Sequence, residues 1–186
     1  TLVKPLFSPQ HNIINKEIIP IINNAKSYIY LPMFLITHKE LANALINAHN
    51  KGVEVKVIHD ATNSHADYSM HKQLRNAGIR VKTENFAGKL HAKTIIVDDY
   101  ISIIGSMNYT SSGNNKNDEN IVVIKDKETA KYLKKTFIYL WNKIPDKYEK
   151  FDPRAESFES VGSCYDGIDN NFDNKIDSED EGCRVK

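Results

Sequence analysis

The chain has 186 residues, of which 40% are hydrophobic and 26% are charged, and its formal net charge at pH 7 is +1. This balance excludes a disordered chain and provides enough apolar mass for one compact domain with a short appendage. The sequence has no apolar run of about 18 residues, so it predicts no helix that spans a membrane.

The small net charge hides two regions of opposite sign. Residues 151–186 hold ten acidic and four basic side chains, which leaves 14 acidic and 21 basic side chains for residues 1–150. The body of the chain is therefore basic and its tail is acidic. A basic body favours a polyanionic partner.

The first half of the chain alternates the patterns of helices and strands. These patterns predict, in chain order, an extended segment over 4–9, a helix over 12–25, a strand over 26–34, a helix over 38–50, a strand over 53–59, a helix over 68–77 and a strand over 79–83. Pro20 is expected to kink the first helix or end it early. The order of helix, glycine and strand around Gly52 is typical of a parallel crossover in an α/β fold.

The second half begins with two runs of β-branched residues. Residues 94–97 and 101–104 predict two strands joined by a tight turn. The sequence then predicts a polar loop over 111–118, a strand over 119–125 and a long amphipathic helix over 127–144. Pro145 is expected to end that helix.

Three short motifs of reactive residues surround the two β-branched strands. They are His91-x-Lys93-x4-Asp98, then Gly105-Ser106-x-Asn108, then Glu119-Asn120. Because side chains two apart on a strand share a face, His91 and Lys93 are expected to point into one pocket. Ser106 and Asn108 repeat that spacing at the end of the second strand.

This set of side chains suits chemistry on a phosphate. The His91 imidazole can attack phosphorus, while Lys93 and Asn108 hold the non-bridging oxygens. A carboxylate such as Glu119 can fix the ring of His91 and stabilise the imidazolium. The scheme needs no metal. The alternative interpretation is a solvated strand edge followed by an ordinary turn, but three motifs in a consistent order favour the functional one.

With these motifs the chain resembles the phospholipase D superfamily over roughly residues 7–145. The resemblance implies an α/β fold with a mixed, mostly parallel sheet flanked by helices. It also implies that His91 forms a phosphohistidine, that Lys93 and Asn108 bind the phosphate, and that Ser106 lines the pocket. Glu119 would orient His91, whereas Asp98 would be structural rather than catalytic.

The resemblance also predicts an oligomeric state. Two-domain members carry the His-x-Lys motif twice, but none of the other six histidines of this chain begins a complete His-x-Lys-x4-Asp. The chain is therefore similar to the single-motif branch, which includes small bacterial endonucleases. A two-fold homodimer is the simple way to place two such motifs face to face.

Several other residues are candidates for substrate contacts. Lys89 and Lys116 are expected either to contact phosphate or to remain ordinary solvated lysines. In the family, the residues after the strand over 26–34 border the active site. Met33, Phe34 and Thr37 are therefore expected near substrate, although a core role fits Met33 and Phe34 equally well.

An acidic stretch follows a linker over 151–163 and occupies residues 164–183. Oxygens at positions 1, 3, 5, 7, 9 and 12 of a calcium loop would come from Asp169, Asn171, Asp173, the Lys175 carbonyl, Asp177 and Asp180. The stretch resembles the Asp-rich calcium repeats of secreted and surface proteins. The alternative is an acidic disordered tail.

Cys164 and Cys183 bracket this stretch and are expected to form a disulfide, which would contribute about 3 kcal/mol in the chain-entropy model. A disulfide and a structural Ca²⁺ both indicate an exported protein, either periplasmic or extracellular. The first residue is Thr1 and no signal peptide follows it, which is expected of a mature or trimmed product.

Three functions are consistent with the sequence. The first is an endonuclease that hydrolyses DNA or RNA in a homodimeric site, which the basic body favours. The second is a hydrolase of phospholipid headgroups, which would need an exposed apolar rim near the site. The third is a non-catalytic module that binds nucleic acid or a surface. The complete set of His91, Lys93, Asn108 and Glu119 weighs against the third.

Overall fold

Seven strands form one mixed sheet in the computed structural model, which describes residues 1–86 and 88–184. In chain order they are β1 (Leu2–Ser8), β2 (Tyr28–Met33), β3 (Glu54–Asp60), β4 (Arg80–Glu84), β5 (Thr94–Val97), β6 (Ile101–Gly105) and β7 (Glu119–Lys125). Their order across the sheet is β1-β7-β6-β5-β2-β3-β4. The predicted α/β fold is thus confirmed.

The parallel part of the sheet is smaller than predicted. Only β2–β3 and β3–β4 pair in parallel among the described strands, whereas β1–β7, β7–β6, β6–β5 and β5–β2 are antiparallel. Short turns join β5 to β6, and adjacent strands with short connections pair antiparallel. The expected extended segment near residue 4 is the edge strand β1. The sheet is mixed, but it is not mostly parallel.

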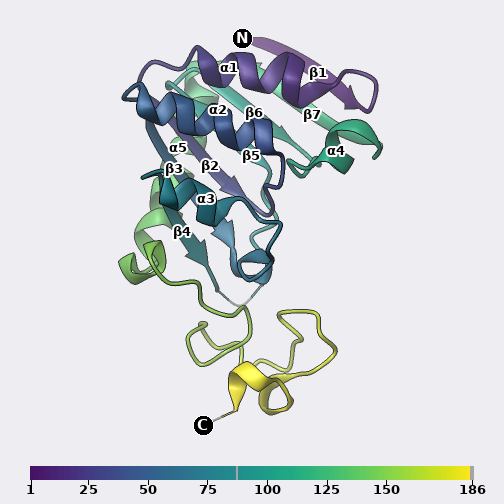
Figure 1. Ribbon diagram of the computed structural model, residues 1–186, viewed down its shortest axis with the longest axis vertical. Coiled ribbons are helices and arrows are strands. Elements are labelled where there is room, and N and C mark those ends of the chain that lie inside the picture. Colours follow the sequence, from purple (N-terminus) through teal and green to yellow (C-terminus); the bar gives the residue numbers. More distant parts are fainter. Residues whose placement is uncertain (87, 185–186) are drawn as a thin grey trace.

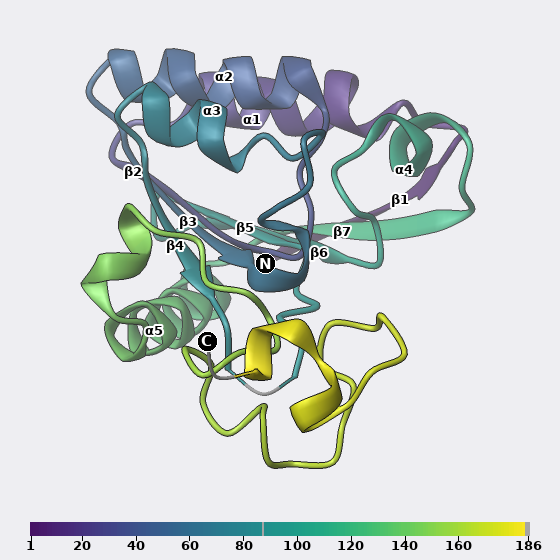
Figure 2. The same ribbon diagram turned by 60° about the horizontal axis from the view of Figure 1, so that its bottom comes forward.

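Helices cover both faces of the sheet (Figure 2). They are α1 (Ile19–Asn23), α2 (Lys39–Asn50), α3 (His71–Asn76), α4 (Ser111–Asn115) and α5 (Lys127–Lys143), with a π-helical segment at Ile14–Ile18 and short 3-10 turns at Ala61–Asn63, Asp146–Glu149, Asp177–Glu179 and Glu181–Cys183. α1, α2 and α3 lie on one face and α5 lies on the other (Figures 1 and 2).

Each face of the sheet has its own apolar core. Side chains alternate along β2, so that Ile29 and Leu31 pack under α1–α3 while Tyr28 and Tyr30 pack against α5. The Tyr30 ring stacks on Phe137 of α5 with centroids 4.7 Å apart. The two cores fix the position of β2, the strand that leads into the region of the motifs.

Two segments differ in detail from the prediction. The first helix changes from a π-helical segment at Ile14–Ile18 to the α-helix Ile19–Asn23, which has Pro20 in its first turn, where the missing N–H of proline costs no helical hydrogen bond. The polar loop over 111–118 contains the short helix α4, whose first turn is capped by Thr110 accepting a hydrogen bond from the Gly113 N–H at 2.9 Å.

Residues 151–184, which we call the C-terminal unit, lie beyond the carboxyl ends of β3 and β4 (Figure 1). The predicted disulfide is present, with a Cα–Cα distance of 5.5 Å between Cys164 and Cys183. Glu156 is fully buried and accepts hydrogen bonds from the backbone N–H groups of Asn170 and Asp177, both at 2.7 Å. The unit is therefore held by a disulfide and by polar contacts.

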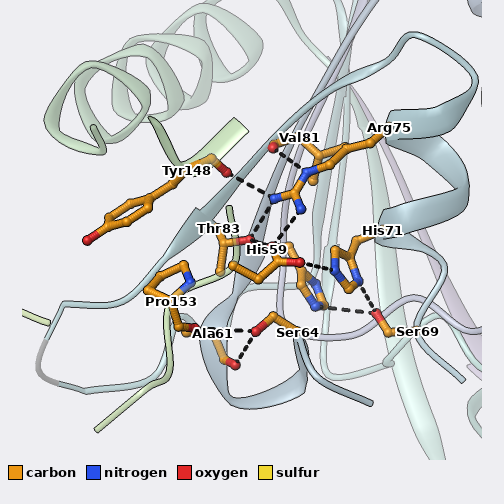
Figure 3. A network of polar contacts seen from close by, with 11 residues as sticks. His59, Ala61, Ser64, Ser69, His71, Arg75, Val81, Thr83, Tyr148 and Pro153 are labelled. Atoms are coloured by element: carbon orange, nitrogen blue, oxygen red, sulfur yellow. Dashed lines mark hydrogen bonds and ion pairs between the residues drawn. The ribbon is translucent and has the colours of Figure 1, made fainter. Parts of the chain in front are cut away.

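A buried polar network attaches this unit to the body (Figure 3). Asp152 binds the Arg75 guanidinium at 2.6 Å, His71 at 3.0 Å and the Thr83 hydroxyl at 2.6 Å. His59 stacks on His71 with ring centroids 4.6 Å apart. The network spans α3, β3 and β4, so it places the C-terminal unit at one edge of the sheet.

Candidate active site

The hairpin of β5 and β6 carries the motif region. The chain reverses at Asp98 and Asp99, whose φ angles of 54° and 51° match the left-handed conformation of a type I′ turn. The Asp98 carboxylate accepts hydrogen bonds from the backbone N–H groups of Lys26, Ser27 and Tyr28. Asp98 thus lies at the opposite end of β5 from His91 and has a structural role.

His91 and Lys93 lie just before β5, at the end of that strand where the sequence predicts the catalytic pocket. Lys93 is 5% exposed, and its Nζ donates a hydrogen bond to the His91 carbonyl oxygen at 2.8 Å. Burial lowers the pKa of Lys93, although the nearby Glu119 and Asp60 carboxylates oppose this shift. The Lys93 amino group therefore lies in a sheltered position directly beside His91.

The His91 ring is accessible, and its surroundings favour the uncharged form. Partial burial, then the charges of Lys93 and Lys89, lower the pKa of His91 below its ordinary value, and Asp60 opposes them. The Phe34 ring lies against the imidazole with centroids 4.8 Å apart and an interplanar angle of 60°. An exposed, neutral imidazole next to a lysine has the properties of a nucleophile.

The second and third motifs meet where β6 and β7 pair. Ser106 donates a hydrogen bond to Glu119 Oε2 at 2.5 Å and accepts one from the Asn120 N–H at 3.1 Å. Gly105 makes this close approach possible, because a Cβ there would collide with the Asn120 carbonyl. The sequence placed Ser106 and Glu119 in one site, and the sheet brings them together.

Two predicted roles are not visible within one chain. In the described part of the molecule, Glu119 accepts hydrogen bonds from Ser106 and from Asn117 at 3.2 Å, and none of its hydrogen bonds goes to His91. The side-chain oxygen of Asn108 is buried without a hydrogen-bond partner among the same residues. The roles expected for Glu119 and Asn108 remain predictions.

Sequence reasoning missed two carboxylates at the ends of β3 and β4. Asp60 and Glu84 are paired in the register of these strands and are 2% and 5% exposed. Asp60 Oδ2 accepts a hydrogen bond from the Leu90 N–H at 2.7 Å, next to His91, and burial raises the pKa of Asp60. Burial raises the pKa of Glu84 to about 7. Asp60 thereby anchors the segment that leads into His91.

Of the remaining candidate residues, Lys89 lies at the site, and Met33, Thr37 and Lys116 have other surroundings. Lys89 Nζ is 5.8 Å from the centroid of the Phe34 ring. Met33 is fully buried in the core, and Thr37 donates its backbone N–H to the Tyr109 carbonyl at 3.0 Å. Lys116 is exposed after α4 and makes no ion pair with the described residues.

The acidic side chains of the C-terminal unit bind their own backbone. Asp169 accepts hydrogen bonds from the N–H groups of Phe172, Asp173 and Asn174 at 2.5, 3.2 and 2.8 Å. Asp180 accepts one from the Asn171 amide at 2.6 Å. Oxygen donors of this kind suit Ca²⁺, but within residues 1–86 and 88–184 no three His, Cys, Asp or Glu side chains converge as a metal site.

Comparisons with known proteins show which family the chain resembles. Residues 18–141 match the family model described as "Cardiolipin synthase, PLD-like domain". The chain is 32% identical over 141 residues to the mitochondrial cardiolipin hydrolase of Homo sapiens, covering 75% of this chain and 54% of that protein. It is 34% identical over 109 residues to a phospholipase D of Rickettsia conorii, covering 59% of this chain and 54% of that protein.

One solved structure is similar over most of the body. Nuc from Salmonella typhimurium, a phospholipase D family member, superposes with a TM-score of 0.70 at 29% identity and covers 77% of this chain and 96% of that chain. The chain spans about half the length of the curated relatives that it matches. No helix among the described residues is long and apolar enough to cross a membrane.

Proposed function

The chain belongs to the phospholipase D-like family, and on that premise we propose that it is a nuclease that hydrolyses phosphodiesters through a phosphohistidine on His91. The observation that carries the proposal is the exposed His91 ring, whose pKa is lowered, next to the buried Lys93. Such a ring keeps its lone pair at neutral pH. The ammonium beside it can bind a phosphate oxygen.

The reaction has two steps in a homodimer. A ring nitrogen of the unprotonated His91 attacks phosphorus and forms a P–N bond, while the P–O bond to the leaving alcohol breaks and that oxygen takes a proton from the partner's His91, which enters this step in its protonated form. The partner's His91, now neutral, removes a proton from water, and the hydroxide forms a P–O bond as the P–N bond breaks. Lys93 and Asn108 hold the phosphate oxygens, Ser106 lines the pocket, and the Glu119 carboxylates stabilise the imidazolium that forms.

A nucleic acid is the substrate that the charge of the body favours. The 21 basic and 14 acidic side chains of residues 1–150 attract a polyanion, and Lys89 and Lys93 stand at the site itself. Lysines that bind phosphates do not read bases, so the sequence specificity of cleavage is expected to be low.

A phospholipid headgroup is the second candidate substrate. Exposed apolar side chains gather in the C-terminal unit, namely Phe151, Phe158, Val161, Tyr165, Ile168, Phe172 and Ile176. Phe172 reaches the site, because Lys89 Nζ lies 3.0 Å from the centroid of its ring. An exposed apolar side chain near the site is what a lipid hydrolase would need.

The test is cleavage of labelled single-stranded and double-stranded DNA and RNA in excess EDTA, beside phospholipid vesicles, with His91→Ala as the inactive control. Cleavage of nucleic acid that His91→Ala abolishes supports the proposal. Turnover of lipid alone would replace the nuclease with the headgroup hydrolase. If wild-type protein binds nucleic acid but cuts neither substrate, the chain is the non-catalytic module instead.

We also infer that the C-terminal unit binds Ca²⁺ structurally in an exported protein. The donor atoms would be those of Asp169, Asn171, Asp173, Asp177, Asp180 and the Lys175 carbonyl, after Asp180 releases the Asn171 amide. The Cys164–Cys183 disulfide supports an oxidising compartment. Calorimetric titration with Ca²⁺ tests the site, and Asp169→Asn should weaken binding at least about tenfold. Titration without heat of binding would refute it.

A further inference from the structure

The C-terminal unit occupies a fixed position beside the active site. Asp152 attaches its first residues to Arg75, His71 and Thr83, and Val161 forms a parallel bridge with Phe86, just before the segment that leads to His91. Glu156 and the disulfide then hold the loop around Phe172. These contacts make the position of Phe172 a property of the fold.

Phe172 lies on the cation next to the catalytic groups. Lys89 Nζ is 3.0 Å from the centroid of the Phe172 ring and 5.8 Å from that of Phe34, whose ring also contacts His91. The Phe172 ring is 62% exposed, so one of its surfaces remains open to a ligand. Two aromatic rings thus lie near Lys89, a lysine to which the catalytic scheme assigns no role.

The two sides of this site carry opposite charge. On the body, Lys89 and Lys93 are positive, whereas Phe172 sits among Asp169 and Asp173 of the C-terminal unit. Asp169 is close enough to oppose the lowering of the Lys89 pKa that burial causes. A depression also lies between the two parts, lined by Thr62 and His65 of the body and by Arg154, Asn171 and Asp173 of the unit, among others.

This arrangement discriminates between ligands. A duplex presents phosphates on all sides, so the acidic unit would repel one of its strands. A single strand can turn its phosphates toward Lys89 and Lys93 and its uncharged bases toward the aromatic rings. Stacking on an aromatic side chain tolerates any base because every base has a π-face.

We propose that Phe172 is a substrate-binding residue and that the C-terminal unit is one wall of the active site, which selects single-stranded nucleic acid over duplex. The inference rests on the proposed nuclease function and gives its substrate class. It assigns to the acidic unit a role in recognition besides the Ca²⁺ binding inferred above.

The experiment compares wild type, Phe172→Ala, Phe172→Tyr and Phe158→Ala on one oligonucleotide, offered single-stranded and as a duplex, in EDTA. Phe158 is the matched control, since it is an aromatic residue of the same unit with 50% exposure. Phe172→Ala should raise KM for the single strand about tenfold, with kcat within about twofold. Phe172→Tyr should restore KM, and Phe158→Ala should match wild type.

A binding measurement separates recognition from catalysis. In the His91→Ala background, Phe172→Ala should weaken binding of a labelled single strand about tenfold and that of the duplex much less. The inference is overturned if wild type cuts both forms equally well, or if Phe172→Ala and Phe158→Ala behave alike. Wild type that cuts no nucleic acid would instead overturn the nuclease proposal together with it.

Discussion

The sheet that carries His91 meets the C-terminal unit at Lys89. Different interactions stabilise these two regions. In the sheet, fully buried apolar residues such as Ile95 and Ile103 fix the strands, and the polar site stands at their ends. In the C-terminal unit, Glu156 and the acidic side chains bind backbone N–H groups, and a disulfide closes the loop. A basic site held by apolar packing thus adjoins an acidic wall held by polar contacts.

The largest expected effect is the loss of catalytic activity when His91 is replaced, while both regions stay folded. His91→Ala should lower kcat/KM at least about 10³-fold, because no other group in the chain replaces the nucleophile. The circular dichroism spectrum and melting temperature should not change, since the ring is exposed. His49→Ala is the matched control, because His49 also precedes a lysine by two residues but lies on α2. Equal losses in the two variants would contradict the assignment.

The second prediction loosens the C-terminal unit alone. Replacing Cys164 and Cys183 by serine should lower the stability of the unit by about 3 kcal/mol, the entropy of closing such a loop. Limited proteolysis should then cut within residues 151–184 while the body resists. Melting of the body, followed through Trp141, provides the internal control. A body that melts together with the unit would show that the two regions fold as one.

The third prediction concerns the network that joins the two regions. Burial, then His71, lowers the pKa of His59 to about 3, so His59 is neutral in the folded protein. The pKa of His59 in the folded protein lies below its value of ~6.5 in the unfolded chain, so the neutral ring contributes its full stability above pH ~6.5. This contribution is lost as the pH falls from there toward about 3. The loss should reach ~2 kcal/mol between about pH 6.5 and 5, at ~1.4 kcal/mol per unit.

Urea unfolding at several pH values measures this loss. The groups that face His59 are Ser69, His71, Asp152 and Arg75. His59→Gln should flatten the stability profile between about pH 6.5 and 5 relative to wild type. His65→Gln is the control and should keep the slope. An unchanged slope in His59→Gln would assign the acid sensitivity to other groups.

The smallest expected effect concerns Lys89, the cation at the contact between the sheet and the C-terminal unit. The charges of Lys93 and Lys89 help to hold the pKa of His91 below its ordinary value, so activity should fall on the acid side only below that value. Lys89→Met removes one positive charge and should move this acid limb of kcat/KM upward by a few tenths of a pH unit, roughly what a screened surface charge contributes. Lys116→Met should leave the limb in place.

The sequence predicted the parts of the site that are local in the chain. His91 and Lys93 stand two residues apart before a β-branched strand, and that spacing sufficed to put them together. Asp60 and Glu84 were missed because they come from the ends of other strands, where only the register of β3 and β4 brings them together. Phe172 was missed because an acidic loop carries no signal of which surface it contacts. The antiparallel majority of the sheet depends on strand order, which local patterns do not contain.

The neighbouring positions of β5, β6 and β7 also have a consequence for how the protein folds. Lys93, Ser106 and Glu119 lie in or next to these strands and can approach through contacts between segments that are close in the chain. Phe34 and Asp60 join them only after β2 pairs with β5, which requires closing a long loop and is a slower event. A chain whose folding stops before that pairing would therefore carry the complete motif without the Phe34 and Asp60 contacts that position His91.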